Sequence, residues 1–227
     1  MHNYLKLLLL VFFLFTSWSF AEPQNNSTNH IKSVVFGAGC FWSVEKKFQE
    51  TLGVIIVESG YADGKKIKPI YREIIKKENR FNPDNYAEVV KVTYNSNHIT
   101  FSELVKIFFE MHDPTQGNRQ GNDIGVQYRS LILASSEKEI SLSNQIKEQY
   151  QVLLEKSGYG LIKTDIKKLS KFFLAENYHQ DYLQKNPNGY CPDNSTGIVF
   201  SEQNKKNVNI SIKRIGRKSL TIMILLE

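Results

Sequence analysis

The segment from residue 34 to residue 45, Val-Val-Phe-Gly-Ala-Gly-Cys-Phe-Trp-Ser-Val-Glu, most constrains how this chain can fold. It begins as a short apolar run, which indicates a buried strand, and its two glycines allow a tight turn. After the turn the apolar residues take a helical period, and Gly53 follows as a stop signal. These apolar residues are Phe41, Val44, Phe48 and Leu52. Cys40 is therefore predicted in the first turn of a helix that directly follows a strand.

Cys40 at a helix start is a candidate nucleophile. Unpaired backbone N–H groups and the positive end of the helix dipole stabilise a thiolate there, and the thiolate is the form of cysteine that attacks. Phe41 and Trp42 place aromatic surface beside the sulfur. The alternative is a buried cysteine that packs as a small hydrophobic residue. The segment alone leaves both interpretations open.

The length of 227 residues and the apolar fraction of 41% suit one soluble globular domain with extra sequence at its ends. The net charge is +6, but residues 201–227 hold six Lys or Arg against two Glu, so the body of the chain is nearly neutral. Nucleic-acid binding needs a basic face on the folded domain. The charge distribution argues against that function.

The N-terminal segment, residues 1–21, resembles an export signal. It has a single Lys, an unbroken apolar run over 7–15 and small residues at its end. The run is short for a membrane-spanning helix, which needs about 20 apolar residues, although an uncleaved anchor stays possible. Residues 22–31 are polar and are expected to form a flexible lead-in. We therefore expect an exported protein, periplasmic or secreted, in an oxidising compartment.

Strands and helices are expected to alternate along the rest of the chain. Strands are predicted at 54–57, 87–94, 131–134 and 162–166, and helices at 100–111, 136–156 and 175–185. Capping boxes at Thr100 and Ser136 open the first two helices. This alternation is typical of a mixed α/β sandwich. The glycine-punctuated loop at 113–130 is long, and long ordered loops are often functional.

The only two cysteines, Cys40 and Cys191, are separated by a long loop. A permanent disulfide between them would stabilise the protein by roughly 4–5 kcal/mol on the chain-entropy model. The alternative is a redox pair, in which Cys40 is oxidised and Cys191, on a turn-rich segment, closes a disulfide on it. Zinc-ligand spacing is absent from the sequence, so no structural metal site is expected.

Three further side chains are candidate partners of the thiol. Glu88 shares a strand face with Val90, so burial would raise its pKa and keep it protonated as an acid; the alternative is a solvated strand edge. Tyr71 and Tyr128 flank loops and can donate hydrogen bonds, although tyrosine in loops is commonly structural.

Two alternatives concern charged and imidazole side chains. Asp123 and Arg129 could form an ion pair within the loop. His112 or His179 could act as a base for Cys40 in a Cys–His hydrolase, although the sequence around the cysteine is not that of a known hydrolase motif.

Taken together, the motifs resemble those of the peptide methionine-S-sulfoxide reductase A family over about residues 32–192. They are Gly-Cys-Phe-Trp-Ser-Val-Glu (39–45), Tyr-Arg-Glu (71–73), Ala-Glu-Val-Val (87–90), the loop from His-Asp-Pro to Tyr-Arg-Ser (112–130), Ala-Glu-Asn-Tyr-His-Gln-Asp-Tyr-Leu (175–183) and Asn-Pro-Asn-Gly-Tyr-Cys (186–191).

The resemblance implies a role for each candidate. Cys40 would attack the sulfoxide sulfur, while Phe41 and Trp42 would bind the substrate's methyl group. Glu88 would protonate the sulfoxide oxygen. The remaining members of the implied site are the hydrogen-bond donors Tyr71 and Tyr128, the pocket residue Asp123 and the resolving thiol Cys191.

The resemblance also implies the fold, domain and partners. The fold would be a two-layer α/β (α+β) sandwich with a mixed β-sheet, a ferredoxin-like core and a long C-terminal coil. The reductase domain would cover 32–200, and the basic tail at 201–227 would have no assigned role. A monomer would reduce methionine sulfoxide in oxidised proteins or peptides, or as the free amino acid. It would use a thioredoxin-like dithiol and neither a metal nor an organic cofactor.

The chain departs from the family pattern before the acidic residue. Tyr86 stands where the family usually has a histidine, and the loop at 76–86 is longer. No cysteine follows Cys191, so Cys191 itself would have to form the reducible disulfide. A non-catalytic exported binding domain, held by a permanent bond between the two cysteines, remains the alternative from another functional class.

Overall fold

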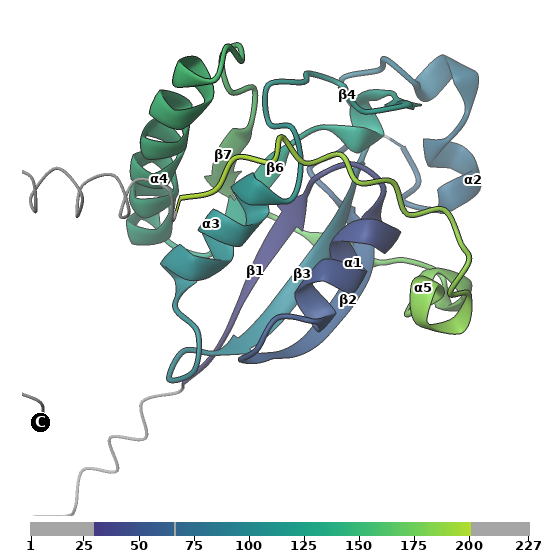
Figure 1. Ribbon diagram of the computed structural model, residues 1–227. Helices are drawn as coiled ribbons and strands as arrows, with labels where there is room; N and C mark the ends of the chain where they lie inside the picture. The colour runs from purple at the N-terminus through teal and green to yellow at the C-terminus, as the bar shows by residue number, and fades with distance from the viewer. Residues whose placement is uncertain (1–29, 66, 201–227) are drawn as a thin grey trace, which may run out of the picture.

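The computed structural model describes residues 30–65 and 67–200 (Figure 1). The segments expected to be an export signal and a basic tail lie outside the described residues. The first strand, β1, spans Ile31–Gly37 and so begins at the end of the expected lead-in.

One six-stranded sheet forms the centre of the molecule, in the order β7-β6-β1-β3-β2-β8. Only β6 and β7 pair in parallel, whereas the other neighbours are antiparallel, so the sheet is mixed as predicted. The strands after β1 are β2 (Val54–Ala62), β3 (Ala87–Asn95), β6 (Leu131–Ala134), β7 (Asp165–Lys168) and β8 (Phe172–Leu174).

The core of the sheet is ferredoxin-like, which confirms that prediction. Helix α1 (Phe41–Gln49) connects β1 to β2, and helix α3 (Phe101–Glu110) connects β3 to β6. The resulting β-α-β-β-α-β unit places β6, β1, β3 and β2 side by side. Both helices cover the same face of the sheet, and α4 (Glu137–Lys156) continues this layer (Figure 1).

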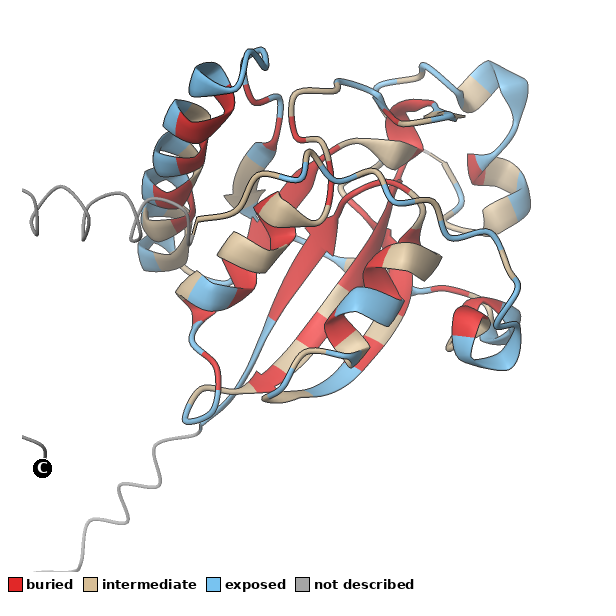
Figure 2. Cartoon of the chain, in the orientation of Figure 1, coloured by how far each residue is buried: buried red, intermediate tan, exposed pale blue. Residues whose placement is uncertain are grey.

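The main hydrophobic core lies between the helices and the sheet. The ring of Phe36 stacks on Phe48 of α1 at 5.0 Å and on Phe108 of α3 at 5.1 Å, so one strand residue joins both helices. Figure 2 shows the strands buried and the outer faces of the helices exposed. A smaller cluster, which includes Val35 and Val89, fills the opposite face of the sheet.

Both predicted N-caps are present. The side chain of Thr100 accepts a hydrogen bond from the N–H of Glu103, and the Glu103 carboxylate accepts one from the N–H of Thr100, which completes a capping box. Ser136 likewise accepts from the N–H of Glu139, but the Glu139 carboxylate accepts from the N–H of Ser135 instead. The return contact of the second capping box is therefore made one residue before the N-cap, at Ser135.

Two predicted helices differ from the structure, and the strand predicted at 162–166 forms instead at Asp165–Lys168. Helix α1 ends at Gln49, so Leu52 does not continue its buried face and is 90% exposed. The helix predicted at 175–185 is replaced by a 3₁₀ turn (Asn177–His179) and the short helix α5 (Tyr182–Lys185). Between them the Gln180 side chain bonds both the N–H and the carbonyl of Ser59, which pins the chain to β2.

The remaining elements are short. They are α2 (Tyr71–Ile74), a 3₁₀ turn (Lys77–Asn79), the two-stranded pair β4 (Arg119–Gln120) and β5 (Asp123–Ile124), and a 3₁₀ turn (Val126–Tyr128). The predicted C-terminal coil, residues 186–200, crosses α1 and α3 (Figure 1). The Tyr150 hydroxyl fixes its far end by donating to the carbonyl of Ile198 at 2.8 Å. Among the described residues, no helix has the length and apolar character needed to cross a membrane.

Candidate active site

Cys40 lies between β1 and α1, as the sequence predicts, and occupies the N-cap of the helix. The turn before it requires glycine. Gly39 has φ of +95°, and a Cβ added there would lie 2.8 Å from Cβ of Gln120. A Cβ on Gly37 would lie 3.2 Å from the backbone oxygen of Glu88. Close backbone approach therefore brings the cysteine turn against β3.

A pocket of about 230 Å³ surrounds Cys40. Seven of the eight predicted site residues line it, although they come from separate strands, helices and loops. The complete lining is Cys40, Phe41, Trp42, Tyr71, Glu88, Asp123, Tyr128 and Tyr190. The structure thus brings together every predicted site residue except Cys191.

Glu88 is a buried carboxyl at the start of β3, only 2% exposed. The N–H of Phe41 donates to its Oε2 atom at 3.3 Å. Burial raises the pKa of Glu88 to about 8 and outweighs that hydrogen bond, which acts in the opposite direction. Glu88 is therefore a protonated acid at neutral pH, and the solvated-edge alternative is wrong.

The thiol of Cys40 differs from the sequence-based expectation of a stabilised thiolate. Burial, followed by the Glu88 carboxylate, raises the pKa of Cys40 well above its ordinary value. The N–H groups of Trp42 and Ser43 lower this pKa, as a helix start should, but burial outweighs them. The resting form is a thiol, and a neutral Glu88 removes one of the contributions that raise the pKa.

Two phenol groups face the thiol and the acid. Burial, and next the Glu88 carboxylate, raises the pKa of Tyr71 to about 12 and raises the pKa of Tyr128 as well. Both side chains therefore remain protonated and available as hydrogen-bond donors across the neutral range.

Asp123 does not pair with Arg129, so that alternative is wrong. The Arg129 guanidinium bonds the carboxylate of Asp63 at 3.0 Å and the carbonyl of Val126 at 2.7 Å, which braces the turn before Tyr128. Burial raises the pKa of Asp123, while its hydrogen bond with Tyr190 lowers it.

Neither internal histidine lines the Cys40 pocket. The Nδ1 atom of His179 accepts from the indole N–H of Trp42 at 3.1 Å. The ring of His112 is bonded to the carbonyl of Phe108 and the hydroxyl of Ser130, each at 2.7 Å. A Cys–His hydrolase would need one of these rings against the thiol, so the geometry disfavours that function.

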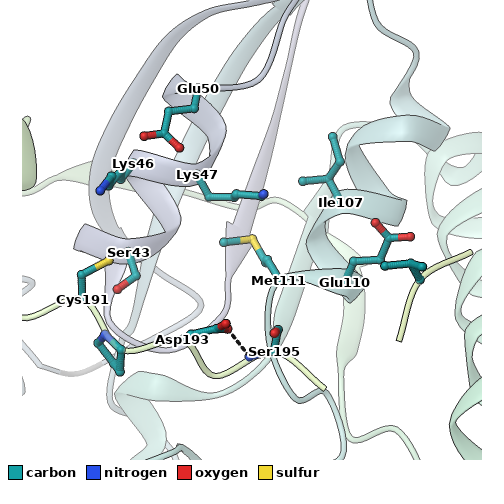
Figure 3. A pocket seen from close by; sticks show the side chains of 12 residues that line it. Ser43, Lys46, Lys47, Glu50, Ile107, Glu110, Met111, Cys191, Asp193 and Ser195 are labelled. Carbon is teal, nitrogen blue, oxygen red and sulfur yellow. Dashed lines mark hydrogen bonds between the residues drawn. The ribbon is translucent and has the colours of Figure 1, made fainter. Parts of the chain in front are cut away.

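Cys191 lies in a neighbouring groove of about 420 Å³ between α1, α3 and the C-terminal coil (Figure 3). Its side chain is close to Ser43, one turn of α1 from Cys40 (Figure 3). Both thiols are free in the structure, and Cys191 is exposed. The thiol therefore has to travel along the start of α1 to reach Cys40.

Sequence reasoning missed Tyr190 and Glu176, and it considered His179 only as a base for Cys40. Tyr190 lines the pocket, and its place beside Cys191 in the Gly-Tyr-Cys motif was the available signal. Glu176 and His179 lie behind the pocket walls, and they belong to the motif at 175–183. Within 30–65 and 67–200, no group of His, Cys, Asp and Glu side chains could hold a metal ion.

Tyr86, the residue that departs from the family pattern, does not line the pocket. It is buried, and its ring meets Phe173 edge-on at 5.5 Å. A Cβ added to Gly64 would lie 2.5 Å from the same ring. The lengthened loop is ordered by Asn85, whose side chain donates to the carbonyls of Ile74 and Asn79. The substitution therefore alters packing behind the pocket rather than the pocket wall.

Comparisons with known proteins agree with this geometry. The sequence model of a family described as peptide methionine sulfoxide reductase matches residues 32–210. The mitochondrial peptide methionine sulfoxide reductase of Homo sapiens is 48% identical over 177 residues, which cover 78% of this chain and 72% of the human protein.

Solved structures of related proteins superpose on the fold. The methionine sulfoxide reductase A of Corynebacterium diphtheriae has a TM-score of 0.67 and 40% identity, covering 77% of this chain and 84% of the other. Mxr1 from Saccharomyces cerevisiae in reduced form has a TM-score of 0.64 and 36% identity, covering 73% of this chain and 91% of the other.

The expected export is contradicted by the comparisons. The similar human and rat proteins are both named mitochondrial, and neither name refers to a secreted or periplasmic protein. The location inferred from residues 1–21 is therefore wrong. An apolar run with a terminal small residue was too general a pattern to identify the compartment.

Proposed function

The chain belongs to the peptide methionine sulfoxide reductase family, and we propose that the thiol of Cys40 is the nucleophile that attacks the sulfoxide sulfur. The protein is an oxidoreductase that reduces methionine sulfoxide to methionine. We assign it the S epimer in peptides and proteins as substrate. We expect it to act as a monomer.

The first step transfers the oxygen atom from the sulfoxide sulfur to the sulfur of Cys40. Glu88 donates its proton to the sulfoxide oxygen and takes up the proton of the Cys40 thiol as the Cys40 sulfur attacks the sulfoxide sulfur. The hydroxyls of Tyr71 and Tyr128 bind the same oxygen, while Asp123 lines the pocket beside it. The sulfur–oxygen bond breaks, methionine leaves, and Cys40 becomes a sulfenic acid. The substrate gains the two electrons that the cysteine loses.

The aromatic wall selects the substrate. Phe41 and Trp42 contribute apolar surface to the pocket, and its volume of about 230 Å³ suits the end of one side chain rather than a large group. Burial of a methyl group against these rings stabilises the complex by about 1 kcal/mol. The wall therefore orients the sulfoxide so that its oxygen points to the acid.

The second step regenerates the thiol. Cys191 attacks the sulfenic acid, water leaves, and a disulfide forms between Cys40 and Cys191. A thioredoxin-like protein then reduces this disulfide by thiol–disulfide exchange, which supplies two electrons and two protons. These steps balance without a metal or organic cofactor. We assign the catalytic domain to residues 32–200.

The observation that carries this proposal is the buried Glu88 carboxyl in the pocket that also holds Cys40. An acid with a pKa of about 8 is protonated at the moment when the sulfoxide oxygen needs a proton. Two phenols in the same pocket retain their protons. A static disulfide-bonded binding domain has no need of this arrangement.

An epimer-resolved assay tests the proposal. The enzyme should reduce the S epimer of a methionine-sulfoxide peptide with dithiol present, and Cys40→Ser should abolish the reaction. Cys191→Ser should still form one methionine per enzyme but should not recycle through the disulfide. Full activity of Cys40→Ser would exclude the mechanism. A protein that only loses stability when reduced, without turnover, would instead support the binding domain.

A further inference from the structure

The segment that departs from the family pattern before Glu88 is also the most basic part of the catalytic body. Residues 65–86 hold seven Lys or Arg against three Asp or Glu, whereas residues 22–200 as a whole carry a net charge of only +1. The rest of the body is therefore slightly acidic. The positive charge is concentrated on one segment of the chain, and none of the proposed chemical steps uses it.

This segment is attached to the Cys40 pocket at two points. Helix α2 lies within it, and the first residue of α2, Tyr71, lines the pocket. The backbone carbonyl of Arg80 accepts a hydrogen bond at 2.8 Å from the N–H of Val126, at the start of the turn that carries Tyr128. Internal hydrogen bonds order the segment between these points. Its charges are therefore held beside the pocket.

Three cations of the segment have no anionic partner in the part of the chain that the structure describes. Lys68, Lys77 and Arg80 are exposed, and their side chains form neither an ion pair nor a hydrogen bond there. Phe81, next to Arg80, is 64% exposed and adds apolar surface. Arginine and aromatic side chains are enriched where proteins bind other chains. The segment therefore offers both charge and contact area to an anionic ligand.

Glu73 does not neutralise this charge, because several cations already share it. Its carboxylate lies 2.6 Å from Nζ of Lys76 and 3.8 Å from Nε of Arg72. The hydrogen bond from Lys76 lowers the pKa of Glu73, and the charges of Arg72 and Lys68 act in the same direction. The Arg72 side chain is still 80% exposed, and it directly follows Tyr71 of the pocket wall. Positive charge therefore remains available at the pocket edge.

A peptide with its sulfoxide in the pocket has to cross the pocket edge with its neighbouring residues. An extended chain advances about 3.3 Å per residue, so positions two or three residues from the sulfoxide lie about 7–10 Å away. The Debye length at physiological ionic strength is about 8 Å, so charges at this separation are only partly screened. Carboxylates at those positions would therefore be attracted to the exposed cations.

We propose that four cations beside the pocket select methionine sulfoxide that is flanked by Asp or Glu; these cations, named here the basic rim, are Lys68, Arg72, Lys77 and Arg80. The inference rests on the proposed function and specifies its substrate class. The basic rim acts on encounter and binding, since charges at an interface edge mainly change association. It does not touch the reacting atoms.

Three peptides that differ only in their flanking residues test this preference. Each carries one methionine S-sulfoxide with two Glu, two Gln or two Lys on either side. At low ionic strength, kcat/KM for the Glu peptide should exceed that for the Gln peptide about fivefold, the scale of two or three exposed ion pairs. The Lys peptide should be the poorest substrate. At about 300 mM salt the ratio of Glu to Gln peptide should fall below about twofold.

A triple variant separates binding from chemistry. Lys68→Gln, Lys77→Gln and Arg80→Gln together remove the three unpaired charges and break no ion pair within the described residues. The variant should lose most of the preference for the Glu peptide through a raised KM. The maximal rate of the first turnover should change less than about twofold, because an interaction that is equal in the ground state and the transition state affects KM alone.

The matched control is a triple variant at exposed positions on α4 or just after it, which changes the net charge by the same amount: Lys138→Gln, Lys156→Gln and Lys163→Gln. Helix α4 lies on the other side of the molecule from α2 (Figure 1). The control should keep the full preference. An equal loss in both variants would refute the inference, because net charge rather than the basic rim would then be responsible.

The remaining outcomes distinguish the inference from the proposed function. If the unaltered enzyme reduces all three peptides equally well, the basic rim selects nothing and only the inference fails. If it reduces none of them, the proposed function fails. Fluorescence anisotropy of the labelled Glu and Gln peptides does not depend on activity, and equal affinities would refute the inference in that case as well. Tighter binding of a single-stranded oligonucleotide than of the Glu peptide would assign the basic rim to nucleic acid and also refute it.

Discussion

The two cysteines occupy opposite kinds of environment. Cys40 follows a glycine with φ of +95°, in a pocket whose walls are joined by hydrogen bonds. Cys191 is exposed on a coil that has no regular secondary structure. The attacking thiol must meet a sulfoxide in one geometry, whereas the resolving thiol must move to reach it. The protein therefore fixes the first thiol and leaves the second on an exposed segment that is itself neither helix nor strand.

A change at the buried acid of the Cys40 pocket is expected to have the largest effect on the difference between the two regions. Glu88→Gln removes the proton donor, so the first turnover should slow by roughly 10²–10³. Quenched-flow measurement of methionine formed without reductant isolates this step. Glu58→Gln alters a half-buried carboxyl on the next strand and serves as the control. A Glu88→Gln rate within twofold of the unaltered enzyme would remove Glu88 from the mechanism.

Glycine substitutions compare the rigidity of the two regions. Gly39→Ala combines positive-φ strain with a clash against Gln120, so it should lower the free energy of unfolding by about 3 kcal/mol. Gly197, in the coil after Cys191, has φ of +72° but open space around it. Gly197→Ala should lower the same quantity by only about 1 kcal/mol. Urea unfolding checks both, and equal losses would contradict the difference in packing.

Thiol titration sharpens the electrostatic side of the comparison. Burial, and then the Glu88 carboxylate, raises the pKa of Cys40. In a Cys191→Ser background, alkylation of Cys40 should therefore accelerate only above pH 9, as its thiolate forms. Adding Glu88→Gln removes the carboxylate and should move the alkylation profile to lower pH. If the alkylation profile is the same with and without Glu88→Gln, the ionisation of Cys40 does not depend on that of Glu88.

The smallest effect is expected at Tyr86, behind the pocket. Tyr86→His restores the usual family residue but loses part of the edge-on contact with Phe173. We expect the free energy of unfolding to fall by about 1 kcal/mol and the first turnover to stay within twofold. Thermal unfolding and the methionine assay measure the two quantities. A large gain or loss of activity would place this residue in contact with substrate.

Local patterns in the sequence predicted the parts of the site that depend on neighbouring residues. The change from apolar run to glycine turn to helical period located Cys40, and alternation along β3 located Glu88 on a buried face. Both follow from the periods of strands and helices, which involve only nearby positions. The resemblance to a known family then indicated which distant residues would join them.

Features that depend on distant side chains were not predicted. The raised pKa of Cys40 requires walls from α2, β3, β5 and the coil, so helix-start reasoning alone gave the opposite direction. Gln180 breaks a helical pattern by bonding the backbone of Ser59, far away in sequence. The Arg129 guanidinium pairs with the carboxylate of Asp63, although Asp123 is nearer in the sequence. Each of these outcomes is decided by tertiary contacts that periodicity does not encode.

The anchoring of the coil on both sides of Cys191 has a kinetic consequence. Helix α5 ends at Lys185, and the hydroxyl of Tyr150 holds the chain again at Ile198. A thiol tethered on so short a span has an effective concentration on the order of millimolar near the sulfenic acid. Peroxide at micromolar concentration meets the same sulfur far less often. The anchored coil therefore favours the recoverable disulfide over further oxidation to the irreversible sulfinic acid.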